Sequence, residues 1–158
     1  MALSCKILVG TMTGTADLVA EELRDAMAAT GGSAEILAMD RLSANAFEAG
    51  ALYLIVSSTY GQGDVPDNAR DFFQAVERER PDLSGVAFGL FGLGDSTYAD
   101  TFCFGPKHFQ RLLTDLGATL VGEPYYHDAA SGTLPEEEAV AWLPRWLETV
   151  PKPLRQAA

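Results

Sequence analysis

Three short stretches of this 158-residue chain combine hydroxyl, glycine, aromatic and acidic residues, the residue types that bind small polar molecules. They read TMTGTA (11–16), SSTYGQGDVPDN (57–68) and GLGDSTYADTFCFG (92–105). An apolar run precedes each of them. If those runs are strands of one parallel sheet, the three stretches meet at one edge and form the walls of a single binding site.

The first stretch has the composition of a phosphate-binding turn. Thr11, Thr13 and Thr15 offer hydroxyl donors, and Gly14 lets the backbone curl around an anion. The turn opens a helix, whose unpaired N–H groups favour negative charge. It contains no Lys or Arg and does not read GxGxxG, so it is neither a Walker A loop nor a dinucleotide fingerprint. A terminal phosphomonoester fits it best, and a plain threonine-capped helix is the alternative.

The second and third stretches each contain a tyrosine, whose flat face is available for stacking. Tyr60 precedes Gly61 and Gly63, which tolerate positive φ and can turn a peptide group toward a planar ligand. Tyr98 lies four residues beyond Gly94. Either stretch alone fits an ordinary connection or a packing feature. Together with the phosphate-binding turn they predict a planar cofactor with a phosphate tail, and FMN meets that description.

The elements that must position these stretches alternate along the chain. Short apolar runs predict buried strands, and apolar residues at intervals of three and four predict helices. The expected strands are 6–10, 33–39, 51–58, 85–94 and 118–128, and the expected helices are 14–29, 65–79, 105–116 and 134–150. Pro124 predicts an edge position or an early end for the fifth strand, and Pro144 predicts a kink or a restart in the last helix.

This alternation predicts an α/β fold in which helices cover both faces of a five-stranded parallel sheet. We expect the strand order 2-1-3-4-5, which binds ligands beyond the carboxyl ends of strands 1 and 3. The length fits one domain over residues 1–150, followed by a short C-terminal tail over 151–158.

The composition is globular and strongly acidic. Eleven Lys and Arg stand against 22 Asp and Glu, which gives a formal net charge of −11. This balance argues against nucleic acid or a membrane surface as a partner and favours basic proteins. Cys5 and Cys103 form no CxxC pair and predict no metal site. Because the sequence has neither a signal-peptide core nor a run long enough to cross a membrane, we expect a cytoplasmic protein. We also expect a monomer.

The three stretches resemble the FMN-binding loops of the flavodoxin-like family. The motifs T.TGTA, TYGQGDVPDNA and FGLGDSTY are particularly similar to those of the FMN domains of diflavin reductases, such as cytochrome P450 reductase. GDVPDN, RPDLSGVAFG, YADTFC and WLPRWL resemble the small stand-alone flavodoxins of the MioC type. The resemblance covers essentially the whole chain and implies the flavodoxin-like three-layer sandwich.

The resemblance also implies a role for individual residues. Those that would cradle the FMN phosphate are Thr11, Met12, Thr13, Gly14, Thr15 and Ala16. Those that would line one side of the isoalloxazine ring are Ser58, Thr59, Tyr60, Gly61 and Gly63, with Tyr60 stacked and the Gly61 carbonyl facing flavin N5. Those on the other side would be Gly92, Leu93, Gly94, Asp95 and Tyr98, with Phe102 and Asp128 at the rim.

These features predict a one-electron carrier and not a stand-alone catalyst. Several carboxylates would surround the flavin, namely Asp64, Asp67, Asp95, Asp100 and Asp128. Because uptake of a second electron adds negative charge in that field, it should occur at a low potential. The expected partners are basic redox proteins: a flavin-containing NAD(P)H reductase as electron donor and a biosynthetic redox enzyme as acceptor.

Two other functions remain open at this point. An FMN-dependent NAD(P)H:quinone reductase would need a nicotinamide site, for which 158 residues leave little room. A flavin-free binding or regulatory module would keep the fold without the cofactor. His108 and His127 belong to no catalytic motif, and we expect them to be structural.

Overall fold

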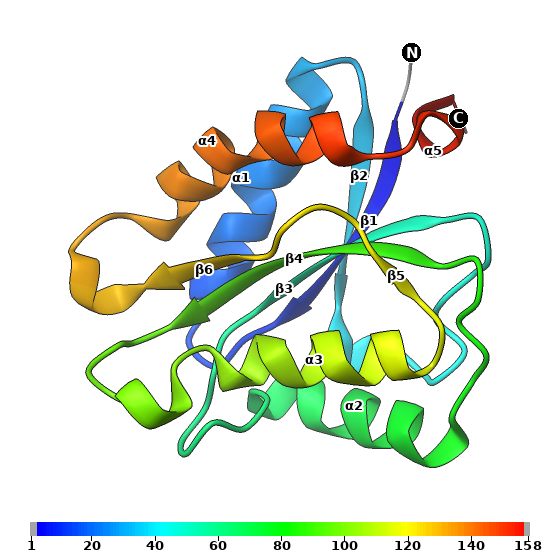
Figure 1. Cartoon of the computed structure of the whole chain (residues 1–158). Coiled ribbons are helices and arrows are strands. Elements are labelled where there is room, and N and C mark those ends of the chain that lie inside the picture. Colours follow the sequence, from blue (N-terminus) through cyan, green and yellow to red (C-terminus); the bar gives the residue numbers. More distant parts are fainter. Residues whose placement is uncertain (1–2, 157–158) are drawn as a thin grey trace.

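In the computed structural model, which describes residues 3–156, a parallel sheet lies between two layers of helices (Figure 1). The strands are β1 (Ser4–Gly10), β2 (Ser33–Ala38), β3 (Leu52–Ser57), β4 (Ala87–Gly94), β5 (Thr119–Leu120) and β6 (Tyr125–Asp128). The helices are α1 (Thr15–Ala29), α2 (Asp67–Glu79), α3 (Phe104–Asp115), α4 (Pro135–Thr149) and the short α5 (Lys152–Gln156).

The strand order is β2-β1-β3-β4-β5, with β6 also paired to β4, so the expected order 2-1-3-4-5 is confirmed. The fifth position holds two short strands in place of one long strand. β5 pairs with Ala87 and Phe88, whereas β6 pairs with β4 from Phe91 to Gly94. Pro124 lies in the gap between them and has no N–H to donate to a ladder, which explains why pairing is interrupted there.

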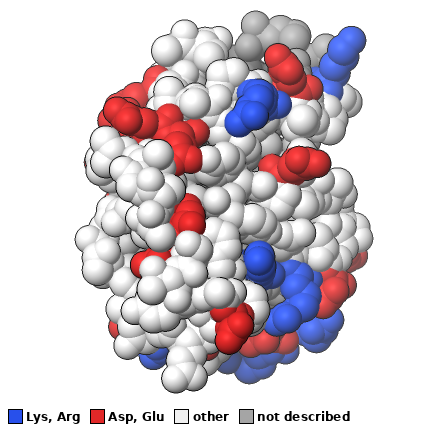
Figure 2. All heavy atoms as spheres, turned by 60° about the vertical axis from the view of Figure 1, so that its left-hand side comes forward, with Lys and Arg blue, Asp and Glu red and all other residues white. Residues whose placement is uncertain are grey.

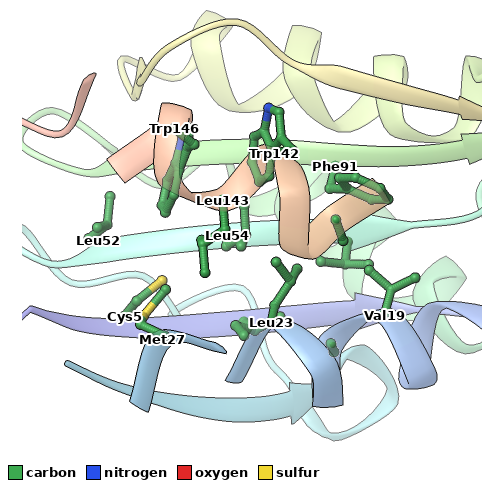
Figure 3. Close-up of a cluster of buried hydrophobic side chains, with 14 of the residues drawn as sticks. Cys5, Val19, Leu23, Met27, Leu52, Leu54, Phe91, Trp142, Leu143 and Trp146 are labelled. Atoms are coloured by element: carbon green, nitrogen blue, oxygen red, sulfur yellow. The ribbon is translucent and has the colours of Figure 1, made fainter. Parts of the chain in front are cut away.

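The central strands are apolar on both faces because both faces are covered by helices. In β3 every residue is buried. Alternate side chains enter two separate cores: Leu54 and Val56 face α1 and α4, while Tyr53 and Ile55 face α2 and α3. Figure 3 shows the first of these cores, where Leu23 of α1 and Leu143 of α4 approach the sheet.

Helix α4 runs without interruption from Pro135 to Thr149, so it does not restart at Pro144. Its indole Trp146 is buried and donates through Nε1 to the Val121 carbonyl at 3.0 Å, which ties the helix to the segment after β5. The spacing of apolar residues in the helix expected over 134–150 predicts that Val140 points inward, and that prediction is wrong, because Val140 is exposed.

The segment after α4 contains α5, from which Leu154 packs against the first core. None of the helices within residues 3–156 has the length and apolar character needed to span a lipid bilayer. Because β1, β3 and β4 are neighbouring parallel strands, their carboxyl ends lie at one edge of the sheet, where the three polar stretches of the sequence begin.

Candidate functional site

A cavity of about 600 Å³ lies at the carboxyl ends of β1, β3, β4 and β6. Its volume falls within the usual range for small-molecule sites. All three polar stretches contribute to its wall, and the loop after β6 closes the remaining side. The lining residues are Thr11, Thr13, Thr15, Ser58, Thr59, Gly61, Leu93, Gly94, Asp95, Tyr98, Thr101, His127, Ala129, Thr133 and Pro135.

The first wall is the turn between β1 and α1. Gly14 stands at the helix start with φ of 95°, and no side chain of the described residues caps α1 there. The Gly14 N–H donates to Thr11 Oγ1 at 2.9 Å, which closes the turn. Asn68, from α2, binds this turn to the strand: its Oδ1 accepts from the Thr11 N–H at 2.7 Å and its Nδ2 donates to the Val9 carbonyl at 3.1 Å. Thr11, Thr13 and Thr15 line the cavity beside this uncapped start of α1.

Two residues of this turn lie outside the cavity wall. Met12 is exposed on the outer side, where its sulfur lies 3.1 Å from the Asp67 N–H. Ala16 is fully buried in the core between α1 and the sheet.

The second wall is a tight hairpin. Tyr60 and Asp64 exchange two backbone hydrogen bonds of 2.8 Å, and the tip between them carries Gly61 and Gly63 at φ of 56° and 99°. Both angles lie in the left-handed region that glycine adopts at little cost. Gly61 lines the cavity, whereas Gly63 and the 41 % exposed Tyr60 lie beside it.

Thr59 links the second wall to the third. Its hydroxyl donates to the Leu93 carbonyl at 3.1 Å and accepts from the Gly105 N–H at 3.2 Å. Thr59 thereby joins the loop after β3 to the end of β4 and to the first turn of α3. These two hydrogen bonds connect the second and third walls on one side of the cavity.

The third wall follows β4 and carries the most exposed large side chain of the site, Tyr98, at 64 %. Asp95 accepts from the Thr97 N–H at 2.9 Å. Asp128, at the end of β6, accepts from the N–H groups of Ser96 and Ala130, each at 2.9 Å. Hydrogen bonding by the Ser96 side chain, together with these two N–H groups, lowers the pKa of the Asp128 carboxyl and stabilises its charged form. Asp128 thus fastens the third wall without lining the cavity.

Two other expected residues of this wall also lie outside the cavity. Gly92 is buried in β4, where a Cβ would stand 2.6 Å from the Pro106 side chain. Phe102 is partly buried, and its ring centroid lies 6.0 Å from the Lys107 ammonium. Gly92 therefore matters for packing between the sheet and α3.

The fourth wall is formed by residues that the sequence did not assign to the site, namely His127, Ala129, Thr133 and Pro135. His127 is 4 % exposed, and its Nε2 lies 3.1 Å from the Thr133 carbonyl and 3.3 Å from the Glu138 carboxylate. Partial burial acts to raise the pKa of Glu138, but hydrogen bonds from Thr133 and Tyr125 and the nearby His127 lower it. No motif marks these residues. The available signal was positional, because the end of the fifth strand lies beside the end of the fourth.

Among the residues that the structure describes, the wall contains no Lys or Arg, and Asp95 is its one carboxylate. An anion held there must be bound by hydroxyls, backbone N–H groups and the α1 N-terminus. No group of three or more His, Cys, Asp or Glu residues within 3–156 could hold a metal ion. The site is therefore suited to an organic ligand that carries a phosphate group and a planar ring.

Comparison with known proteins identifies the family. The Flavodoxin family model matches residues 7–142. Protein MioC of Escherichia coli strain K12 is 35 % identical over 141 residues, covering 89 % of this chain and 94 % of that protein. Flavodoxin YqcA of the same strain is 37 % identical over 140 residues, covering 89 % and 93 %.

An NADPH-dependent diflavin oxidoreductase of Cryptococcus neoformans is 36 % identical over 145 residues, which are 90 % of this chain but 23 % of that protein. Among solved structures, a cysteine-to-serine mutant of flavodoxin from Pseudomonas aeruginosa superposes with a TM-score of 0.79 at 33 % identity, covering 93 % of this chain and 98 % of that one. Fold, family model and relatives agree: the chain belongs to the flavodoxin family and is an FMN-binding electron-transfer protein.

Proposed function

We propose that this flavodoxin is a one-electron carrier that holds FMN in the cavity at the carboxyl edge of its sheet. The phosphate would lie in the Thr11–Thr15 turn, and the ring between the Tyr60 hairpin and the Tyr98 loop. The observation that carries this assignment is that one cavity of about 600 Å³ joins an uncapped helix start to a glycine hairpin and an exposed tyrosine.

The residues present fit that cofactor. A Cβ built on Gly14 or on Gly61 would meet no described atom within 4 Å, so both backbones open onto free space. Donors for a phosphate come from Thr11, Thr13 and Thr15 and from the helix start. The faces of Tyr60 and Tyr98 are accessible for stacking because both side chains are exposed.

Bound FMN supplies the redox chemistry, since it takes up and releases electrons singly. The protein binds the cofactor, orients it and adjusts its electronics. The hydroxyl of Thr59 joins the second wall to the third, and the carboxylate of Asp128 joins the third wall to the end of β6. Asp95 places a negative charge in the wall, which opposes the uptake of further electrons.

Charge removal at the cavity tests this electrostatic argument. Asp95→Asn, and Asp64→Asn at the end of the hairpin, should each raise the more negative of the two midpoint potentials of bound FMN. Asp115→Asn is the matched control, because it removes the same charge from the far end of α3. Spectroelectrochemical titration measures both potentials. An equal shift in all three variants would contradict a local effect.

The partners we propose are basic redox proteins: a flavin-containing NAD(P)H reductase that delivers electrons and a biosynthetic redox enzyme that receives them. The net charge of −11 supports this choice, because opposite charges steer encounter and raise association rates. We further propose that the protein works as a monomer in the cytoplasm.

An FMN titration of the purified protein tests the function directly. We expect FMN fluorescence to be quenched until one FMN is bound per chain. On reduction of the complex, the two electrons should enter in separate steps. The protein alone should not consume NAD(P)H in steady state. Sustained NAD(P)H consumption would favour a quinone reductase, and the absence of quenching would contradict the assigned cavity.

A further inference from the structure

The hairpin that forms the second wall of the cavity is held from behind by helix α3. We propose that His108, on α3, is a positioning residue that fixes the Gly61–Gly63 tip and thereby sets the affinity and the potentials of the bound FMN. This inference rests on the proposed function, because it takes the tip to be the part of the hairpin that meets the flavin.

The principal contact is a hydrogen bond across 45 positions of sequence. His108 Nε2 lies 2.8 Å from the Gly63 carbonyl oxygen. Since a carbonyl only accepts, Nε2 carries the proton and donates. The other ring nitrogen, Nδ1, lies 3.1 Å from an Arg111 guanidinium nitrogen, which only donates, so Nδ1 accepts. Arg111 therefore fixes the tautomer and the direction of the imidazole ring.

Close packing leaves the hairpin little freedom on this side. A Cβ on Gly105 would lie 2.4 Å from the Ser58 carbonyl, and a Cβ on Gly63 would lie 3.0 Å from the Phe104 ring. The rings of Phe73 and Phe104 both meet the imidazole edge-on at centroid distances of 6.3 Å. These ring contacts and the Arg111 contact hold the imidazole with Nε2 directed at the Gly63 carbonyl.

His108 has no place in the cavity wall itself. It lines a separate hollow between α2 and α3, together with Arg70, Phe73 and Arg111. The residue thus acts on the site through the hairpin. Its effect is specific, because Gly63 is one of two tip residues with positive φ, and a glycine peptide rotates easily unless its carbonyl is held.

Two substitutions separate the hydrogen bond from the bulk of the side chain. His108→Leu removes the donor, whereas His108→Gln keeps an N–H that can reach the Gly63 carbonyl. We expect the leucine variant to bind FMN about fivefold more weakly, the factor that loss of one hydrogen bond produces. The two midpoint potentials of its bound FMN should move closer together. The reason is that tip peptides which are free to rotate no longer hold their hydrogen-bonding groups in one orientation toward the flavin. The glutamine variant should keep most of the wild-type affinity and separation.

The measurements are FMN titration and spectroelectrochemistry of the FMN-loaded proteins, with urea unfolding of each variant to show that it is folded. If the leucine variant does not fold, His108→Met replaces it, because methionine has no N–H or O–H donor and adds no charge that would itself shift the potentials. Wild-type values in the donorless variant, or equal losses in the glutamine variant, would overturn the role of His108 alone. Failure of the wild-type protein to bind FMN would overturn the proposed function and this inference with it.

Discussion

Cys103 shows how a single residue can connect several parts of the site. It precedes α3 with φ of 56°, a backbone conformation that is costly for a residue with a side chain. A Cβ on Gly94 would lie 2.7 Å from the Cys103 backbone nitrogen, so the end of β4 presses directly on it. Cys103 is held in this conformation because the chain on both sides is fixed, by the cavity wall before it and by α3 after it.

The chemistry of this thiol gives a first prediction. Burial raises the pKa of Cys103 to about 12, and burial raises the pKa of Cys5 to about 12 as well. Both thiols should remain protonated and unreactive toward Ellman's reagent at about pH 8, near the ordinary thiol pKa. Unfolding in guanidinium should release two reactive thiols per chain. Rapid labelling of the folded protein would contradict the buried positions of these side chains.

Asp128 gives a prediction about pH. Hydrogen bonds from the Ser96 side chain and from the N–H groups of Ser96 and Ala130 lower its pKa in the folded protein, so the charged carboxylate contributes stability above the unfolded pKa of about 3.9. That contribution is lost as the pH falls through the lowered folded value. Asp128→Asn should therefore be less stable than wild type near neutral pH, and the difference should close in acid. Urea unfolding at several pH values measures it, and a constant difference would count against this account.

At the scale of elements, the packing of α4 against β4 depends on a glycine in the strand. Gly89 lies beneath the Trp146 indole, and a Cβ there would come within 2.4 Å of the ring. The indole also donates to the Val121 carbonyl. The glycine therefore allows α4 to approach the sheet closely enough for both contacts.

Gly89→Ala should destabilise the protein by about 1–3 kcal/mol, the usual cost of overpacking a core. Urea unfolding measures the loss. The double variant with Trp146→Phe should lose less than the sum of the two single variants, because the smaller ring makes room for the added methyl group. Strict additivity would mean that the alanine is accommodated without contact with the ring.

The strands, the helices and their order in the sheet were predictable. Strands that are apolar on both faces must be covered by helices on both sides, and few folds satisfy that requirement. What the pattern could not supply depends on distant contacts. The fifth strand is divided at Pro124 into two strands that pair with different parts of β4. The proline predicted an interruption, but not that pairing resumes after it. His108 and His127 carry no local motif, and their roles follow from bonds to Gly63 and Thr133 that exist only after folding. Val140 fits a helical stripe, but α4 turns that position to solvent.

At the scale of the molecule, charge is distributed unevenly over an acidic surface. Figure 2 shows one main group of Lys and Arg at the lower right of the visible face, while Asp and Glu are spread over several parts of it. Helices α2 and α3 carry Arg70, Arg78, Lys107 and Arg111. With a net charge of −11, the long-range field is nevertheless that of an anion. At long range the field therefore attracts basic partners, whereas at close range the basic group repels them.

This field predicts opposite salt effects for acceptors of opposite charge. Electron transfer from the reduced protein to a basic haem protein such as cytochrome c should slow by about tenfold as ionic strength rises from about 0.01 to 0.3 M, because salt screens the attraction. Transfer to ferricyanide, an anion, should accelerate over the same range because screening removes a repulsion. Stopped-flow rates at several salt concentrations give both slopes. If the rates of both acceptors change with salt in the same direction, salt alters the protein or the flavin itself. If they change in opposite directions, the effect arises in the encounter and therefore from the acidic surface.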